Sequence, residues 1–401
     1  MTTSSTMTPE PAHTPNIGTA AMEDRDRVDY TTLRAARRAR AFAEMDRLGL
    51  DACLLGREAN VKYFSGARRL WTASSRPFGP TAVAVRATGR VHLMTFSASY
   101  EGAPAEVPFE DVYCLSFNIG KLLEAVAAVP ELRGAQRIGV DGFSPFLRDL
   151  LPSALPNAEF VGIEPELCAM RRIKLPAEIE VIRTAVAIAE SSLFHAASAV
   201  TPGVTEKQVQ AAFIDRMCTL GTSQFAQQGT FTIIDPHDGL RWITSERRLD
   251  EGSLVALAGG ALWAGYEGSL ARTWFCGRQT SPRAEHHALH DRWRSVMDRV
   301  IGACRPGRTG ADVVAAHEAA GEALPPMPIL YGIGLGHEGA VAGSSLGTEV
   351  DRRQRIEAGM VLGVRTYVAG AAGGYLGEDM VLVQEDGPEV LTTLGPGPLG
   401  G

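Results

Sequence analysis

The segment GYEGSLARTWFCG, residues 265–277, contains the strand on which our fold assignment is built. Its second half, ARTWFCG, combines aromatic and β-branched residues with a closing glycine, which is typical of a β-strand followed by a turn. Four further segments share this character: TFTIID (230–235), SLVALAGG (253–260), MVLGVRTYV (360–368) and DMVLVQ (379–384). Together they predict a mostly antiparallel, strongly curved sheet.

Helical patterns flank these strands. The longest, MRRIKLPAEIEVIRTAVAIAESSLFHAASAV (170–200), has apolar residues every three to four positions and carries Pro176 near its start. Three more predicted helices are TPGVTEKQVQAAFIDRMCTLG (201–221), HALHDRWRSVMDRVIGAC (287–304) and TGADVVAAHEAAGEAL (309–324). Helices packed on a curved antiparallel sheet form an α+β domain, which we expect over residues 167–396.

Residues 29–166 predict a smaller α/β domain. TTLRAARRARAFAEMDRLG (31–49) has helical spacing and ends on glycine. The strand candidates are DACLLG (51–56), RVHLMTF (90–96) and QRIGVDG (136–142). Residues 1–28 are rich in Thr, Ser and Pro, so we expect a disordered tail there, and residues 397–401 are expected to form a second, short tail.

Composition excludes several classes of protein. The 401 residues are 45% hydrophobic and 21% charged, which fits a globular protein with a full core. The formal net charge of -7 argues against nucleic-acid and anionic-membrane partners, because both favour a basic face. The N-terminal segment lacks the basic-then-apolar order of a signal peptide. The six cysteines form no CxxC pair, which favours free thiols, so we expect a cytoplasmic location.

Seven segments resemble the creatinase/aminopeptidase P superfamily, which is peptidase family M24, and they follow one another in the same order as in that superfamily. They are YFSGARR (63–69), MRRIKLPAEIEVIRTA (170–185), VTPGVTEKQV (200–209), SERRLDEGSLVAL (245–257), GYEGSLARTWFCG (265–277), EAGMVLGV (357–364) and GGYLGEDMVLVQEDGPEVLT (373–392). The resemblance covers roughly residues 32–395. It implies an α+β pita-bread catalytic domain preceded by a smaller creatinase-type α/β domain. It also implies a homodimer in which each N-terminal domain caps the other subunit's pocket.

Metal-bearing members of this superfamily hold two divalent ions with five carboxylate and imidazole ligands, because two ions need dense anionic oxygen to offset their repulsion. Aligned on Arg272 and Thr273, the resemblance puts these five positions at Ala258, Ser269, Tyr331, Arg365 and Glu378. Only Glu378 keeps the ligand type, and a guanidinium at residue 365 brings positive charge to the place of a metal. The resemblance therefore implies a site without metal, and we expect no cofactor.

The metal-free members of the superfamily are creatinase and ectoine hydrolase, which cleave C–N bonds in small zwitterionic, amidine-like substrates. YGIGLG (331–336) resembles the ectoine hydrolase pattern, which also has Tyr where the peptidases have His. The nucleophilic Glu of that enzyme falls at Ala258, or at Ala256 with a one-residue gap. The guanidinium-binding Glu positions of creatinase fall at Ala271 and Arg365. The chain thus departs from both patterns at the reacting positions.

Four residues are our candidates for catalysis. His337 follows a glycine-rich run and is the candidate general acid/base, with its neighbour Glu338 expected to orient it. Tyr331 is expected to donate to a developing oxyanion, and Glu378 to act as a base or as the partner of Arg365. Arg241 falls where the peptidases have their proton-shuttle histidine. That histidine falls at His237 instead if a short insertion is allowed.

Substrate binding is expected to favour a carboxylate, because guanidinium groups hold carboxylates bidentately. Arg76 resembles the arginine of the creatinase N-terminal domain that grips substrate across the dimer interface. Trp242 is expected to supply an apolar or cation–π wall. The candidate binding residues are Arg365, Arg76, Glu267, Tyr266, His237 and Asp379. The alternative interpretations are a structural ion pair for Glu378 with Arg365, a surface position for Arg241, and a structural role for His337.

The leading hypothesis is a metal-independent enzyme that hydrolyses a C–N bond in a small anionic or zwitterionic nitrogen compound. Because the nucleophilic Glu is missing, a cyclase, lyase or dehydratase on the same scaffold is the first alternative, since such reactions need only proton transfer. A non-catalytic binding protein is the second alternative. An active Xaa-Pro peptidase, which requires metal, is the least favoured. No nucleic-acid or membrane partner is expected.

Overall fold

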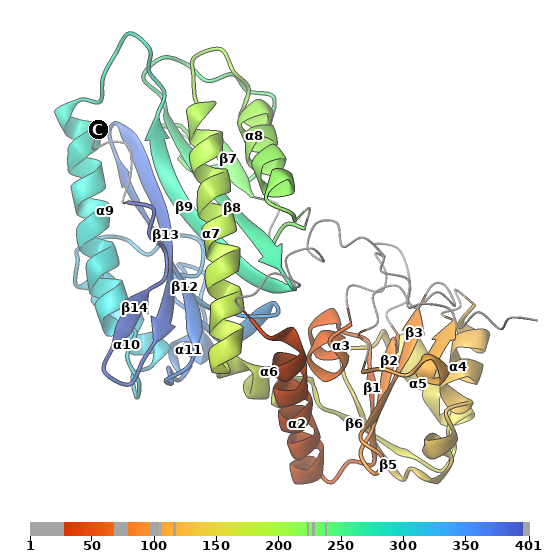
Figure 1. Ribbon diagram of the computed structural model, residues 1–401. Coiled ribbons are helices and arrows are strands. Elements are labelled where there is room, and N and C mark those ends of the chain that lie inside the picture. The colour runs from red at the N-terminus through yellow and green to blue at the C-terminus, as the bar shows by residue number, and fades with distance from the viewer. Residues whose placement is uncertain are drawn as a thin grey trace, which may run out of the picture.

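The computed structural model describes residues 28–67, 79–95, 104, 106–114, 118–222, 224–226, 229–236 and 239–395, and Figure 1 shows that they form two domains side by side. The two predicted tails lie outside the described residues, apart from Val28. No helix in the described ranges is long and apolar enough to cross a bilayer.

The N-terminal domain is built on a mixed sheet with the strand order β4-β3-β2-β1-β5-β6. The strands are β1 (Ala52–Leu55), β2 (Ala82–Val85), β3 (Arg90–Thr95), β4 (Val112–Cys114), β5 (Arg137–Val140) and β6 (Glu159–Gly162). The helices are α2 (Tyr30–Leu48), α3 (Glu58–Ser65), α4 (Ile119–Ala127), α5 (Pro145–Ala154) and α6 (Glu164–Arg172), with 3₁₀ turns at Phe109–Asp111 and Pro130–Gly134. The predicted helix at 31–49 and the three predicted strands are confirmed.

Both faces of this sheet are buried, which explains why its central strand is apolar without interruption. Cys53 and Leu55 of β1 pack in one core with residues of α2, whereas Ala52 and Leu54 pack in another with residues of α4 and α5. Successive residues of a strand point to opposite faces, so a strand covered on both sides needs apolar residues at every position.

The C-terminal domain contains a larger, entirely antiparallel sheet with the order β11-β10-β12-β13-β9-β8-β7, and β14 pairs with β13. Its strands are β7 (Thr230–Ile234), β8 (Leu254–Trp263), β9 (Tyr266–Phe275), β10 (Leu330–Ile333), β11 (His337–Ala342), β12 (Val361–Gly370), β13 (Gly373–Val383) and β14 (Pro388–Val390). Its helices are α7 (Pro176–Ser198), α8 (Glu206–Thr219), α9 (Ala284–Ala303), α10 (Gly310–Glu318) and α11 (Glu349–Arg352). The predicted α+β domain with an antiparallel sheet is confirmed.

The predicted single helix over 170–200 is wrong at its start, because the chain forms two helices there. α6 ends at Arg172, and α7 begins at Pro176. Leu175 is extended, with φ -71° and ψ 152°, as expected for a residue that precedes proline. The break creates a short linker, residues 173–175, between the two domains.

Helices cover both faces of the C-terminal sheet, with α7 and α8 on one side and α9 on the other (Figure 1). α7 approaches β9 very closely at Gly268, where an added Cβ would lie 2.2 Å from the backbone carbon of Ala185. Gly377 of β13 similarly makes room for the Trp293 ring of α9. These glycines set the distance between the sheet and its covering helices.

We predict that Gly268→Ala destabilises the C-terminal domain, because helix backbone cannot move away as a side chain can. Overpacking of this kind costs about 1–3 kcal/mol, equivalent to a fall in Tm of roughly 2–12 °C for a domain of this size. The control is Gly302→Ala, where an added Cβ meets nothing within 4 Å. Thermal unfolding should show an unchanged or raised Tm for the control, and an unchanged Tm for Gly268→Ala would contradict the packing described.

Candidate active site

A cavity of about 160 Å³ opens in the C-terminal sheet, between β7, β8, β9, β12 and β13. Its side-chain lining includes Thr230, Trp242, Ala258, Ser269, Arg365 and Glu378. Strand register explains why these residues meet: Ala271 of β9 lies opposite Ala258 of β8 on one side and opposite Glu378 of β13 on the other. Arg365 of β12 lies directly opposite Glu378. The antiparallel pairing therefore brings residues 120 positions apart in the chain into one cavity.

The carboxylate of Glu378 is fully buried and accepts hydrogen bonds from three side chains. Ser269 Oγ donates to its Oε1 at 2.8 Å, and the Tyr331 hydroxyl donates to the same oxygen at 2.5 Å. Arg365 Nε donates to Oε2. Arg365 also donates through Nη2 to the Tyr331 hydroxyl at 3.0 Å, and its guanidinium lies 5.2 Å from the centre of the Tyr331 ring.

The side chains at four of the five aligned metal-ligand positions are thus in direct contact around one carboxylate, and the fifth position, Ala258, lines the same cavity. The alignment made on Arg272 and Thr273 groups residues that the fold also groups. The side chains at these positions differ in type from metal ligands. A hydroxyl, a phenol and a guanidinium, all hydrogen-bond donors here, surround the one remaining carboxylate.

The electrostatic environment keeps the Tyr331 phenol and the Arg365 guanidinium protonated. Burial raises the pKa of the Tyr331 phenol well above its ordinary value; the charges of Glu378 and Glu267 add to this rise, while Arg365 opposes it. Burial alone would lower the pKa of Arg365, but the neighbouring Glu378 and Tyr331 outweigh it and raise the pKa. Glu267, a predicted substrate-binding residue, is 3% exposed and does not line the cavity. Its charge acts on both Tyr331 and Arg365, so these three residues and Glu378 form one electrostatic cluster.

The donor set of this cavity does not fit the two metal ions of the metal-bearing family members. Arg365 directly contacts the only carboxylate in the lining, so a cation already occupies the position from which a metal would bind Glu378. Within the described ranges, no group of three or more His, Cys, Asp and Glu side chains is close enough to hold a metal ion.

Arg241 does not line this cavity, which corrects its expected place beside Tyr331 and Glu378. Its guanidinium forms an ion pair with the buried Glu206 of α8. Glu206 also accepts from the amide nitrogens of Ile233 and Ser245, at 2.9 Å each. The pair therefore joins α8 to β7 and to the segment that follows β7, which is a structural role.

Tyr266 and Asp379 were also expected at the site, but both are buried away from this cavity. The hydroxyl of Tyr266 is hydrogen-bonded to Arg37 and Glu178, at the junction with the N-terminal domain. Asp379 follows Glu378 in β13, so its side chain points to the opposite face. There it accepts from Arg272 Nη2 at 2.6 Å and from Thr392 Oγ1 at 2.7 Å.

The side chains of three predicted site residues lie outside the described part of the structure. Arg76 and His237 lie outside the described residues. His337 is described by its backbone, which begins β11 and pairs with Ile333, and its side chain is outside the described set. Its neighbour Glu338 does not have the expected orienting role, because its carboxylate is buried against Arg171, Lys174 and the Leu335 amide.

Two lining residues went unrecognised in the sequence as functional groups. The resemblance assigns Ser269 only to a lost ligand position, although that alignment already predicts that its hydroxyl faces the site. Thr230 gave no signal, because a threonine at the start of a strand is common. Trp242 lines the cavity, as expected, and remains 40% exposed, so its indole lies at the open side.

Comparisons with known proteins agree with this architecture. The model of the Creatinase/Prolidase N-terminal domain matches residues 37–173, and the model of metallopeptidase family M24 matches residues 180–385. The chain is 25% identical to an Xaa-Pro dipeptidase of Pyrococcus furiosus, over 87% of this chain and 95% of the relative. It is 27% identical to a creatinase of a Bacillus species, over 88% of this chain and 89% of the relative.

Among solved structures, an X-Pro aminopeptidase of Thermotoga maritima superposes with a TM-score of 0.73 at 22% identity, covering 89% of this chain and 98% of that one. This likeness shows that the two chains share the pita-bread fold with its creatinase-type N-terminal domain. Because the M24 model matches more than half of its residues and the order of domains is the same, the chain belongs to metallopeptidase family M24.

Proposed function

We propose that this M24 family member is a metal-independent hydrolase that cleaves a C–N bond in a small anionic or zwitterionic nitrogen compound. The observation that carries this proposal is the buried contact between Arg365 and Glu378 inside the cavity. A guanidinium bound to the only lining carboxylate replaces the charge that a metal supplies in metallopeptidases. The similarity to a creatinase over 88% of the chain supports hydrolysis as the reaction class.

The size and lining of the cavity support a small substrate. Its volume of about 160 Å³ is below the usual range for drug-sized ligands, roughly 300–1,000 Å³. Arg365 in the lining favours a carboxylate or another planar anion. The Trp242 indole at the open side suits a planar cationic nitrogen group, which an aromatic face attracts. A zwitterion whose anionic group contacts Arg365 and whose cationic group contacts Trp242 satisfies both residues.

Each proposed step uses a residue of this chain. Arg365 holds the substrate anion through the N–H groups that it does not donate to Glu378 and Tyr331, and its charge stabilises the negative charge that develops when water adds to the electrophilic carbon. The Tyr331 hydroxyl donates its single proton to Glu378, so it keeps that carboxylate in place and, contrary to expectation, does not donate to the oxyanion. His337 accepts the proton from that water and delivers it to the nitrogen as the C–N bond breaks, so that the products are an acid or urea-type compound and a free amine. Glu378 fixes Arg365 and Tyr331, and the Trp242 indole binds the cationic part of the substrate.

A second candidate is a metal-dependent Xaa-Pro dipeptidase. It is favoured by the Xaa-Pro dipeptidase of Pyrococcus furiosus, with which the chain aligns over 87% of its length. This function requires Arg365 to leave Glu378 and two metal ions to bind with few anionic ligands. Manganese ions and a dipeptide substrate therefore separate the two functions experimentally.

We predict that small carboxylates stabilise the metal-free chain in a thermal-shift screen of creatine, guanidinoacetate, cyclic imino acids and Xaa-Pro dipeptides. A ligand at about 100 times its Kd adds roughly 2.7 kcal/mol, a shift of several degrees for a domain of this size. Mn²⁺ alone should produce no shift. Stabilisation by Mn²⁺, with dipeptide hydrolysis that appears only in its presence, would instead establish the peptidase.

Removal of the Arg365 charge should abolish this ligand response. Because Arg365→Ala leaves Glu378 buried and unpaired, it also destabilises the fold by about 3–5 kcal/mol. The double variant Arg365→Met/Glu378→Gln removes both charges and should retain most of the stability while losing the response. The control is Arg247→Ala, an exposed arginine paired with Asp235 and absent from the cavity lining. A full ligand shift in the double variant would contradict the proposed binding role.

A further inference from the structure

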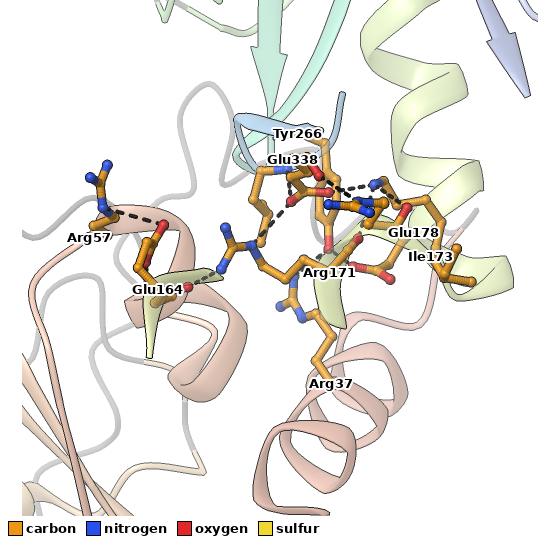
Figure 2. Close-up of polar contacts among 12 residues, drawn as sticks. Arg37, Arg57, Glu164, Arg171, Ile173, Glu178, Tyr266 and Glu338 are labelled. Carbon is orange, nitrogen blue, oxygen red and sulfur yellow. Dashed lines mark hydrogen bonds and ion pairs between the residues drawn. The ribbon is translucent and has the colours of Figure 1, made fainter. Parts of the chain in front are cut away.

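Two buried polar clusters connect the N-terminal domain to one end of the C-terminal sheet, and Figure 2 shows them together. Neither contributes a side chain to the cavity lining. One ends on the first residue of β9, the strand that supplies Ser269 to the cavity. The other ends on the loop that follows β10, the strand whose Tyr331 is hydrogen-bonded to Glu378. This loop, residues 334–336, carries His337 at its end.

The first cluster joins α2, α7 and β9. Arg37 is 2% exposed and donates through Nη1 to the Tyr266 hydroxyl at 3.0 Å. That hydroxyl in turn donates to Glu178 of α7. The other oxygen of Glu178 accepts from the Leu175 amide of the linker at 2.7 Å. The start of β9, and with it Glu267, is therefore fixed by a residue of the N-terminal domain.

The second cluster is centred on Glu338, which is 1% exposed. Its Oε1 accepts from Arg171 Nε at 3.2 Å and its Oε2 accepts from Lys174 Nζ. Arg171 also donates to the side chain of Asn60 in α3, whose amide nitrogen donates to Asp141 at 3.0 Å. A continuous chain of hydrogen bonds thus runs from the core of the N-terminal domain to the β10–β11 loop.

Glu338 also determines the shape of that loop. Its Oε1 accepts from the Leu335 amide at 3.0 Å, which closes the turn. Gly334 leaves room for the carboxylate, since an added Cβ would lie 2.2 Å from Glu338 Oε2. The Gly334 carbonyl then accepts from the Glu267 amide at 3.0 Å. The loop is therefore bound on one side to the domain linker and on the other to a residue of the electrostatic cluster around Tyr331.

We propose that Glu338 is a positioning residue, through which the N-terminal domain of the same chain holds the β10–β11 loop in the geometry that the reaction needs. A buried carboxylate between two cations is rigid only when all three groups are paired, so the loop and the linker form one unit. Glu338 touches no lining group and acts through the backbone of residues 334–337. Its effect on turnover rests on the proposed role of His337, whereas its effect on the loop does not.

The test uses hydrogen–deuterium exchange of the full chain, read in peptides that span residues 330–338. In Glu338→Ala the Leu335 amide loses the charged acceptor that closes the turn, so we expect exchange of the loop amides to rise about tenfold to a hundredfold. In the double variant Glu338→Gln/Lys174→Met the Gln oxygen still accepts from the Leu335 amide and from Arg171, and the Lys174 charge is removed together with the carboxylate. We expect near-normal exchange there.

A buried methionine outside both clusters, Met297 of α9, supplies the control for lost stability. Met297→Ala should lower Tm without any local change at residues 330–338. Unchanged loop exchange in Glu338→Ala, or an equal rise in Met297→Ala, would overturn the proposal.

Kinetics then test the effect on the reaction, with whichever of creatine, guanidinoacetate or glycyl-proline the wild-type chain cleaves. We expect kcat to fall at least about tenfold in Glu338→Ala, with a smaller change in KM, and to recover in the double variant. A loosened loop with normal kcat would overturn the positioning role in catalysis. If the wild-type chain cleaves none of these compounds, the proposed function fails, and the exchange experiment alone decides whether Glu338 holds the loop.

Discussion

The ion pair between Arg365 and Glu378 is the contact on which the candidate site depends. β12 and β13 lie side by side over ten residue pairs, and this register places the two side chains opposite each other in the middle of the sheet. A buried carboxylate without a partner is strongly destabilising, so each partner requires the other to remain. The pair therefore couples the stability of the central strands to the chemistry of the cavity, and Tyr331 and Ser269 complete the coordination of the carboxylate.

The same sheet also links the cavity to the N-terminal domain. Tyr266 at the start of β9 and Glu338 at the start of β11 are both held by residues of α2, the linker or α6 (Figure 2). Buried charge pairs are individually weak sources of stability, because desolvation opposes their attraction. Here these pairs contribute orientation, because a guanidinium and a carboxylate bind each other at a defined angle, whereas apolar packing does not define one. The smaller domain thus has a structural reason to remain attached to the catalytic one.

Much of the fold could be predicted from the sequence because its strands and helices have strong local signals. The antiparallel sheet, the amphipathic helices and the two-domain order follow from hydrophobic periodicity and from glycine boundaries. β10 and β11 were not predicted, since YGIGLG is short and glycine-rich, and the strand character here arises from the pairing of β10 with β11 and β12. The linker was missed because helical spacing continues across Leu175, and only the proline geometry breaks it.

In the candidate site, the sequence predicted only the residues whose place in the fold follows from the resemblance to the superfamily. The five ligand-equivalent residues meet as expected, because strand register is inherited with the fold. The partners of Arg241, Tyr266 and Asp379 were not predictable, since Glu206, Arg37 and Arg272 are distant in sequence and each pair forms through tertiary packing. Sequence periodicity shows that a side chain is buried, but it does not identify the group that it is buried against.

The most direct test of the central claim is a crystal structure of the chain grown with excess manganese and measured at the manganese absorption edge. We predict an intact contact between Arg365 and Glu378 and no anomalous peak within the cavity. Two anomalous peaks beside Glu378, with the Arg365 side chain displaced from it, would contradict a metal-independent site and establish a metallopeptidase centre in its place.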